Sequence, residues 1–183
     1  MSLENLLIVP IDEIDEQLIN NLSYKLGNVF KLNIRIKKWN TISEIPRSEF
    51  KFRSMYRSTE LLNYFSENAL EKNCKILFIA DHDLYSPVFS KFYGEAQLNG
   101  KTGILSLFHL KEENRNRIIN KQILLSRVEK EAIHEVGHLF GLIHCREKNC
   151  VMHLSSTIND IDVKSSLFCN HCIDVFKYST HGV

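Results

Sequence analysis

The chain has 183 residues and a mass of 21.3 kDa, which is long enough for one domain with a substantial core. Hydrophobic residues make up 44% and charged residues 25%, with 7 glycines and 3 prolines, so the composition excludes disordered, collagen-like and disulfide-dense small proteins. The 23 basic residues nearly balance the 22 acidic residues, the formal net charge is +1, and no apolar run is long enough to span a membrane. We therefore expect neither nucleic acid nor a membrane as a partner.

The first residues, MSLENLLIVPIDEIDEQ, lack the basic and apolar regions of a secretory leader. We therefore expect a cytoplasmic protein, in which thiols stay reduced. Four of the five cysteines nonetheless cluster between Cys145 and Cys172, near the C-terminus. Because disulfides are not expected, this clustering suggests a metal site.

Three segments with regular patterns open the chain. Residues 5–10, NLLIVP, form a short apolar run that predicts a buried strand. Apolar residues then recur every three or four positions over 12–27, which predicts a helix that ends at a glycine. Residues 31–38 alternate apolar and polar side chains and predict a strand with one buried face, formed by Leu32, Ile34 and Ile36.

The following segments continue the alternation of helix and strand. The patterns predict a helix over 58–72, a central strand over 75–80, a hairpin that turns at Asn99–Gly100, and a third helix over 122–141. This order of elements predicts an α/β (α+β) fold, in which helices pack on a twisted mixed sheet of about five strands.

The composition changes after the third helix. Residues 142–183 hold four of the five cysteines and four of the eight histidines, and they show little apolar periodicity. We therefore expect one domain over 1–183, made of a sheet-and-helix part over 1–141 and a cysteine-rich part over 142–183. A bound metal is expected to order the second part, because burial alone cannot easily do so.

The third predicted helix ends in HEVGHLFGLIH. His134 and His138 are four residues apart and share one helix face, so both rings can reach one zinc ion. A straight helix would carry His144 about 15 Å beyond His134. The chain must therefore turn back before His144, and Gly141 can adopt the left-handed conformation of such a turn. Three protein ligands leave the fourth position of zinc for water, as in catalytic sites.

Glu135 lies about 100° around the helix from the first of these histidines. Its carboxylate then lies beside the open side of the metal, where it can take a proton from water. The alternative is a cluster of surface histidines on an amphipathic helix. Val136, Leu139 and Phe140 look like core positions, however, and the polar groups of a buried helix need partners.

A second cluster follows directly after this motif. It consists of a C-x4-C pair and a C-x2-C pair separated by a long intervening segment, a spacing typical of a four-thiolate zinc site. The four candidate ligands are Cys145, Cys150, Cys169 and Cys172. The alternatives are a redox pair at the C-x2-C, or inert core cysteines. His153 or His171 could also replace one of the sulfur ligands. The fifth cysteine, Cys74, precedes the strand over 75–80 and is most simply a core residue.

These residues resemble the metzincin pattern H-E-x-x-H-x-x-G-x-x-H with a downstream methionine, Met152. The adjacent Cys145, the C-x-M of Cys150–Met152 and the C-x2-C of Cys169–Cys172 look like the archaemetzincin family of zinc metallopeptidases. The upstream segment FYGEAQLNGKTGILSLFHL is similar to the edge-strand region of that family. The spacer after the methionine is one residue shorter than family spacers can be, which we interpret as a difference in loop length.

The resemblance implies a metzincin-like fold, with an active-site helix that ends at a glycine and a zinc-stapled C-terminal subdomain. It implies two zinc ions, a catalytic one on His134, His138 and His144, and a structural one on Cys145, Cys150, Cys169 and Cys172. It further implies that Glu135 is the general base and that Met152 forms a hydrophobic floor beneath the catalytic metal. An ordinary core position is the alternative for this methionine.

The activity that follows is hydrolysis of peptide bonds by a zinc-activated water, with a peptide or protein as the substrate. The resemblance places an extended substrate along the strand near Phe92–Gln97. The alternative function is a zinc-stabilised module that binds peptides or proteins with little or no turnover. Glu135 argues against that alternative, because a structural site needs no acid there. A thiol redox protein is a third hypothesis.

Overall fold

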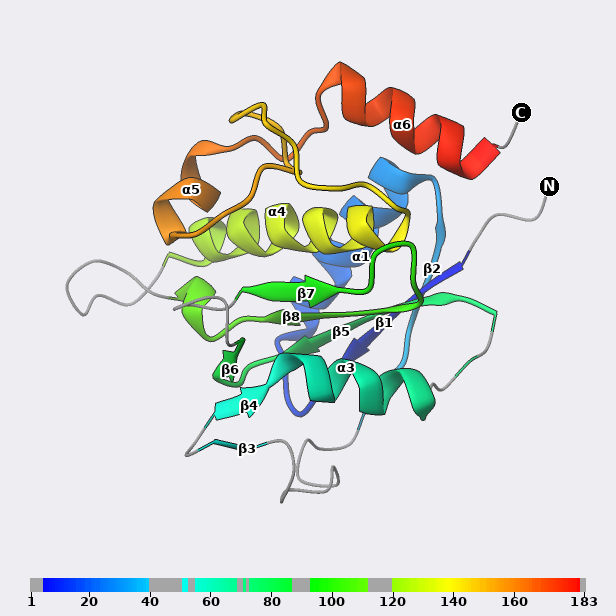
Figure 1. The fold of residues 1–183 in the computed structure, drawn as a ribbon. Coiled ribbons are helices and arrows are strands. Elements are labelled where there is room, and N and C mark those ends of the chain that lie inside the picture. Colours follow the sequence, from blue (N-terminus) through cyan, green and yellow to red (C-terminus); the bar gives the residue numbers. More distant parts are fainter. Residues whose placement is uncertain are drawn as a thin grey trace.

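The computed structural model describes residues 5–39, 51–52, 55–68, 71, 73–86, 93–111 and 120–181. Five strands form the main sheet in the order β2-β1-β5-β8-β7, and a small second sheet has the order β3-β4-β6 (Figure 1). The strands of the main sheet are β1 (Asn5–Pro10), β2 (Asn33–Ile36), β5 (Lys75–Ala80), β7 (Gly94–Ala96) and β8 (Thr102–Ser106). Those of the second sheet are β3 (Lys51–Phe52), β4 (Met55–Arg57) and β6 (Leu84–Tyr85). The α-helices are α1 (Glu16–Phe30), α3 (Ser58–Glu67), α4 (Lys121–Leu139), α5 (Ile158–Val163) and α6 (Asn170–His181).

The main sheet is mixed, as the sequence predicted. β2, β1, β5 and β8 are parallel neighbours, whereas β7 pairs antiparallel with β8. The predicted hairpin between these last two strands is confirmed. Asn99 lies in its turn with a φ of 51°, a left-handed conformation that asparagine tolerates better than most residues. Among the described strands, β7 is the outermost at the end of the sheet where the hairpin lies.

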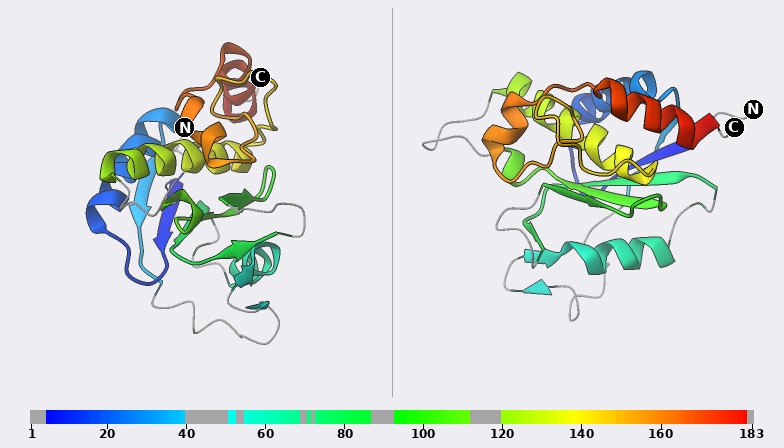
Figure 2. Two further views of the ribbon diagram at one scale, coloured as in Figure 1. Left: turned by 90° about the vertical axis from the view of Figure 1, so that its left-hand side faces the viewer. Right: turned by 45° about the horizontal axis from the view of Figure 1, so that its top comes forward.

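The central strands bury both of their faces. In β1, Leu6 and Ile8 belong to the core beneath α1 and α4, whereas Leu7 and Val9 belong to the core beneath α3. Figures 1 and 2 show α1 and α4 on one face of the sheet and α3 on the other. Both faces are therefore covered, which explains why the segments of β1 and β5 are apolar throughout instead of alternating.

The first helix is displaced from its predicted range. α1 begins at Glu16, where the side chain of Asp15 accepts a hydrogen bond from the Gln17 amide, and it runs through Gly27 to Phe30. The prediction that Gly27 ends the helix is wrong. Phe30 is buried in the core, which favours another turn of helix, and the chain leaves the helix only at the next residue.

The second strand is less buried than its alternation predicted. Leu32 and Ile34 pack only partly against the core, and Ile36 is 43% exposed. β2 is the strand at the other end of the sheet, and within the described part of the chain it pairs on one side, with β1. An apolar residue at such an edge can remain in contact with water.

The helix predicted over 58–72 ends earlier, at Glu67. At its C-cap, both the main-chain amide and the side-chain amide of Asn68 donate to the carbonyl of Tyr64. Leu70 of the predicted helix lies outside the described residues. The strand predicted over 75–80 is confirmed, and the long helix predicted over 122–141 is α4.

The cysteine-rich part contains two helices that the sequence analysis did not identify, α5 and α6. Thr157 and Asp160 form a capping box at the start of α5. Apolar burial also orders this part of the chain, because four aromatic rings pack together with centroids 5.4–6.2 Å apart: Phe30, Phe140, Phe168 and Phe176. Burial therefore contributes to the order of this part, and the expectation that a bound metal is needed as well stays a prediction.

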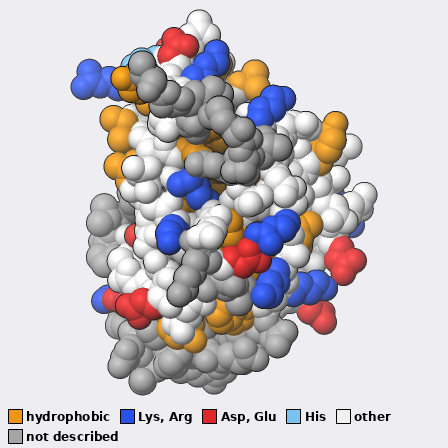
Figure 3. Space-filling model, turned by 90° about the vertical axis from the view of Figure 1, so that its right-hand side faces the viewer, with side chains coloured by type: hydrophobic (Ala, Val, Ile, Leu, Met, Phe, Trp, Pro, Cys, Tyr) orange, Lys and Arg blue, Asp and Glu red, His pale blue; other side chains and the backbone are white. Residues whose placement is uncertain are grey.

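Basic and acidic side chains lie side by side on the face of the molecule in Figure 3, in keeping with the balanced charge of the chain. In the part of the chain that the structure describes, no helix combines the length and the apolar character needed to cross a bilayer.

Candidate metal centres

Helix α4 ends in a turn that reverses the chain. The Leu142 amide donates to the Gly137 carbonyl at 3.0 Å, and the Gly141 amide donates to the His138 carbonyl at 2.9 Å. These two bonds form a Schellman motif, with Gly141 in the left-handed region at a φ of 86°. The helix therefore ends at Leu139, two residues before the predicted end at Gly141, and the predicted turn at that glycine reverses the chain before His144.

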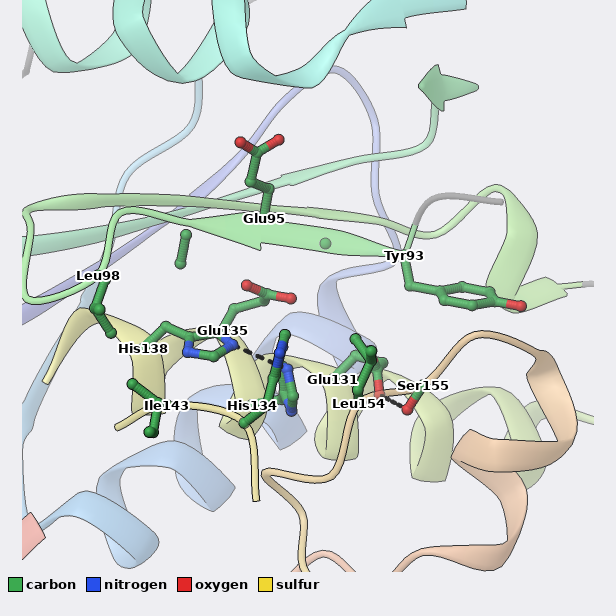
Figure 4. Close-up of a pocket in the computed structure, with 13 residues that line it drawn as sticks. Tyr93, Glu95, Leu98, Glu131, His134, Glu135, His138, Ile143, Leu154 and Ser155 are labelled. Atoms are coloured by element: carbon green, nitrogen blue, oxygen red, sulfur yellow. Dashed lines mark hydrogen bonds between the residues drawn. The ribbon is translucent and has the colours of Figure 1, made fainter. Parts of the chain in front are cut away.

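This turn brings three imidazole rings together beside a cavity of about 330 Å³ (Figure 4). Ring centroids are 4.6 Å apart for His134 and His138, 5.2 Å for His134 and His144, and 4.9 Å for His138 and His144. One nitrogen from each ring lies within 4.8 Å of the other two. Nitrogens about 2.0–2.1 Å from one zinc ion are roughly 3.4 Å apart in a tetrahedral site, so the cluster has the size that zinc requires.

Main-chain carbonyls orient two of these rings. Nδ1 of His134 lies 2.9 Å from the Val151 oxygen, and Nδ1 of His138 lies 2.7 Å from the Leu142 oxygen. Because a carbonyl can only accept, both Nδ1 atoms donate, and each Nε2 keeps its lone pair for a metal. Burial lowers the pKa of His134 well below its usual value and that of His138 to about 4. Both rings are then neutral near pH 7, which is the form that binds metal.

Glu135 lies buried between these histidines and strand β7 (Figure 4). Among the described residues its Oε2 atom has no hydrogen-bond partner, although the side chain lines the cavity. Burial, and then the neighbouring charge of Glu131, raises the pKa of Glu135 well above the usual range. A buried carboxylate oxygen without a partner, on a side chain that lines a cavity, can be satisfied by a water molecule or a substrate group.

The four clustered cysteines also come together. The sulfurs of Cys145 and Cys169 are 3.7 Å apart, as are those of Cys150 and Cys172. A disulfide would need about 2.0 Å, whereas thiolates about 2.3 Å from one zinc ion are roughly 3.8 Å apart in a tetrahedron. In the described part of the chain this group contains four sulfurs and neither His153 nor His171. Cys74 lies apart, in the core beneath α3.

Met152 packs directly beneath the helical turn that carries the first two histidines. Its side chain is fully buried, and a β-carbon built on Gly137 would lie 2.5 Å from its sulfur. The methionine therefore lies against bare main chain, and the glycine is what permits this contact.

Sequence analysis missed two groups at this site, Glu131 and Lys164. The pair is buried, with Nζ and Oε1 2.7 Å apart, and Glu131 lines the cavity. The position of Glu131, one helical turn before His134, is a signal that could have revealed it. Lys164 has no such local signal, because it reaches the site from the cysteine-rich part.

Comparisons with known proteins identify the family of the chain. The model of peptidase family M54 matches residues 14–178. The archaemetzincin of Methanocaldococcus jannaschii is 35% identical over 167 residues, which cover 91% of this chain and 89% of that protein. The crystal structure of the archaemetzincin from Methanopyrus kandleri has a TM-score of 0.83 at 25% identity and covers 98% of this chain and 97% of that one. The archaemetzincin of Archaeoglobus fulgidus, solved in complex with malonate, has a TM-score of 0.75 at 27% identity, with coverages of 93% and 99%. The chain therefore belongs to peptidase family M54, the archaemetzincins, and is a zinc-dependent peptidase.

Proposed function

We propose that His134, His138 and His144 hold a catalytic zinc ion and that Glu135 is the general base of peptide-bond hydrolysis. One observation carries this proposal. A buried carboxylate with an oxygen that no described residue contacts by a hydrogen bond lines the same cavity as three clustered imidazoles. A metal held only for structure would need no acid at this position.

When bound, zinc supplies a Lewis acid that polarises a water molecule and the scissile carbonyl. Glu135 accepts the proton of the attacking water and returns it to the leaving amine. Between these two transfers the carboxyl of Glu135 holds the proton. The carbonyls of Val151 and Leu142 keep two of the rings in orientation.

We further propose that an extended peptide or protein segment binds along β7. Gly94, Glu95 and Ala96 line the cavity, and β7 pairs with β8 on its inner side as the last strand of the main sheet. A substrate can therefore add to the outer edge by main-chain hydrogen bonds, which recognise any sequence. Phe92, at the start of the predicted binding strand, lies outside the described residues.

The four cysteines are proposed to hold a second, structural zinc ion. Cys145 directly follows His144, so a fixed sulfur at 145 also fixes the main chain that presents the third imidazole. Structural zinc sites contribute folding free energy on the order of 10 kcal/mol, which would add to the aromatic packing of this part. All four thiols must stay reduced to bind metal, and this supports a cytoplasmic location.

The test combines metal analysis with cleavage of a diverse peptide library, read by mass spectrometry. We expect Glu135→Ala to keep its zinc but to cleave at least about 100-fold more slowly than the parent. Glu129→Ala removes a carboxylate from the same helix at a position that does not line the cavity, and it should cleave at the parent rate. A Glu135→Ala variant that cleaves as fast as the control would exclude the general-base role.

A further inference from the structure

A buried ion pair lies beside the histidines and has no part in the chemistry proposed above. Glu131 belongs to α4 and Lys164 directly follows α5, and their side chains are 5% and 0% exposed. Fully buried lysines are rare. A buried pair of this kind adds little stability over apolar residues of similar size, because both charges lose their hydration. Stability alone therefore does not account for it.

The lysine holds a turn that also orients the candidate metal ligands. Three consecutive carbonyls of this turn, residues 151–153, each accept a hydrogen bond from a different part of the site. These bonds join the Val151 oxygen to Nδ1 of His134 at 2.9 Å, the Met152 oxygen to the amide of Cys145 at 2.9 Å, and the His153 oxygen to Nζ of Lys164 at 3.2 Å. The first bond orients the imidazole of His134. The second fixes Cys145, which directly follows the ligand candidate His144, and the third holds the turn itself in place.

We infer that the Glu131–Lys164 pair positions the histidine site by holding the turn over residues 151–153 against helix α4. An apolar side chain could fill the space of Lys164 but could not donate to the carbonyl of His153. Glu131 neutralises the ammonium group, which would otherwise repel a metal cation nearby. Glu131 also accepts a hydrogen bond from the hydroxyl of Ser155 at 3.3 Å, so the segment is tied to the helix twice.

This inference rests on the proposed role of the histidines as ligands, but it concerns metal binding and not hydrolysis. Lys164→Met alone would leave a buried carboxylate unpaired and is expected to unfold easily. The informative variant is therefore the double substitution Glu131→Gln, Lys164→Met, which removes both charges at similar volume. We expect it to unfold near the parent's urea midpoint yet to bind metal at the histidine site about 10- to 100-fold more weakly, the loss typical when groups that orient metal ligands are removed.

Cobalt(II) is the probe, because its absorption separates a thiolate site, with intense charge-transfer bands, from an imidazole site. Competition with a chelator then gives the affinity of each site in the same protein. The matched control is Arg127→Met, Asp162→Asn. It removes another ion pair between α4 and α5, in which Arg127 donates twice to the carboxylate of Asp162 at 2.7 Å. Neither of these two contacts involves the turn over residues 151–153.

Weaker cobalt binding at the histidine site, with the thiolate bands and the control variant unchanged, supports the inference. Parent-like affinity in the double variant overturns it, and so does an equal loss in the control, which would indicate general loosening between the helices. A separate variant, His134→Ala, tests the premise. If the imidazole bands of the parent persist in that variant, the proposed metal site fails, and this inference fails with it.

Discussion

The main chain of Gly94 lies in contact with the carboxylate of Glu135. A β-carbon built on Gly94 would lie 2.5 Å from Oε1 of Glu135 and 2.8 Å from its Cδ and Cγ atoms. The collision therefore involves the stem of the side chain and not only its tip. Strand β7 crosses the glutamate this closely because residue 94 has no side chain (Figure 4).

This contact predicts that Gly94→Ala displaces Glu135 and slows hydrolysis without loss of zinc. A displacement of about 1 Å in a catalytic group can lower kcat/KM about 100-fold. Steady-state kinetics and elemental analysis of the same preparation check both parts. Gly27→Ala is the control, because a β-carbon there would meet Cγ1 of Ile34 at 3.4 Å, which is an ordinary van der Waals contact. A Gly94→Ala variant with the parent's rate would contradict the prediction.

The four-sulfur cluster predicts that the parent holds two zinc ions and that Cys169→Ser holds one. Loss of a sulfur ligand should also lower the thermal midpoint, because the second zinc contributes to folding. Elemental analysis of reduced, fully metallated protein measures the stoichiometry, and calorimetry measures the midpoint. Cys74→Ser changes a cysteine in the separate core beneath α3, so its zinc content should stay at two. One zinc ion in the parent would rule out the second site.

The parts of the site that the sequence predicted share a local signal. In HEVGHLFGLIH the third imidazole can approach the first two only if the helix ends before it. Gly141 lies between them and adopts the conformation that the turn requires. The strands over 5–10 and 75–80 were predicted for a similar reason. A strand with both faces covered is a short run of apolar residues, and such a run can be recognised from the sequence without its neighbours.

The parts that the sequence did not predict depend on distant neighbours. Lys164 pairs with Glu131 across the interface between two parts of the fold, and neither residue type predicts burial. At Gly27 a local signal gave a wrong prediction. The glycine suggested the end of the helix, but burial of Phe30 favours its continuation to that residue. Helix α5 was missed although Thr157 and Asp160 have the spacing of a capping box, since so short a helix shows no periodicity.

Acid release of metal from the histidine site is predicted to occur well below pH 6.5. Protons and metal compete for the same imidazoles, and metal affinity falls as the pH drops through the pKa of the free rings. Burial lowers the pKa of His138 to about 4 and moves that of His134 in the same direction, so the loss shifts to lower pH. A cobalt absorption titration from pH 7 to pH 4 measures it. Release centred at or above pH 6.5 would show that the rings titrate like exposed imidazoles.

Large apolar side chains at one end of the cavity predict a preference among peptide substrates. Leu98 is 57% and Ile143 is 68% exposed, and both line the cavity on the side of His138 (Figure 4). Because apolar surface gains free energy when a substrate covers it, peptides with a large aliphatic or aromatic residue beside the scissile bond should be cleaved preferentially.

Ile143→Ser should then lower kcat/KM for such peptides by about 10-fold and leave peptides with alanine at that position unchanged. Val163→Ser is the matched control, because Val163 is 76% exposed but does not line the cavity. The library profile of each variant provides the measurement. Enrichment of large apolar residues that persists in Ile143→Ser would assign the preference to another part of the cleft, since the exposed isoleucine would then contribute nothing to it.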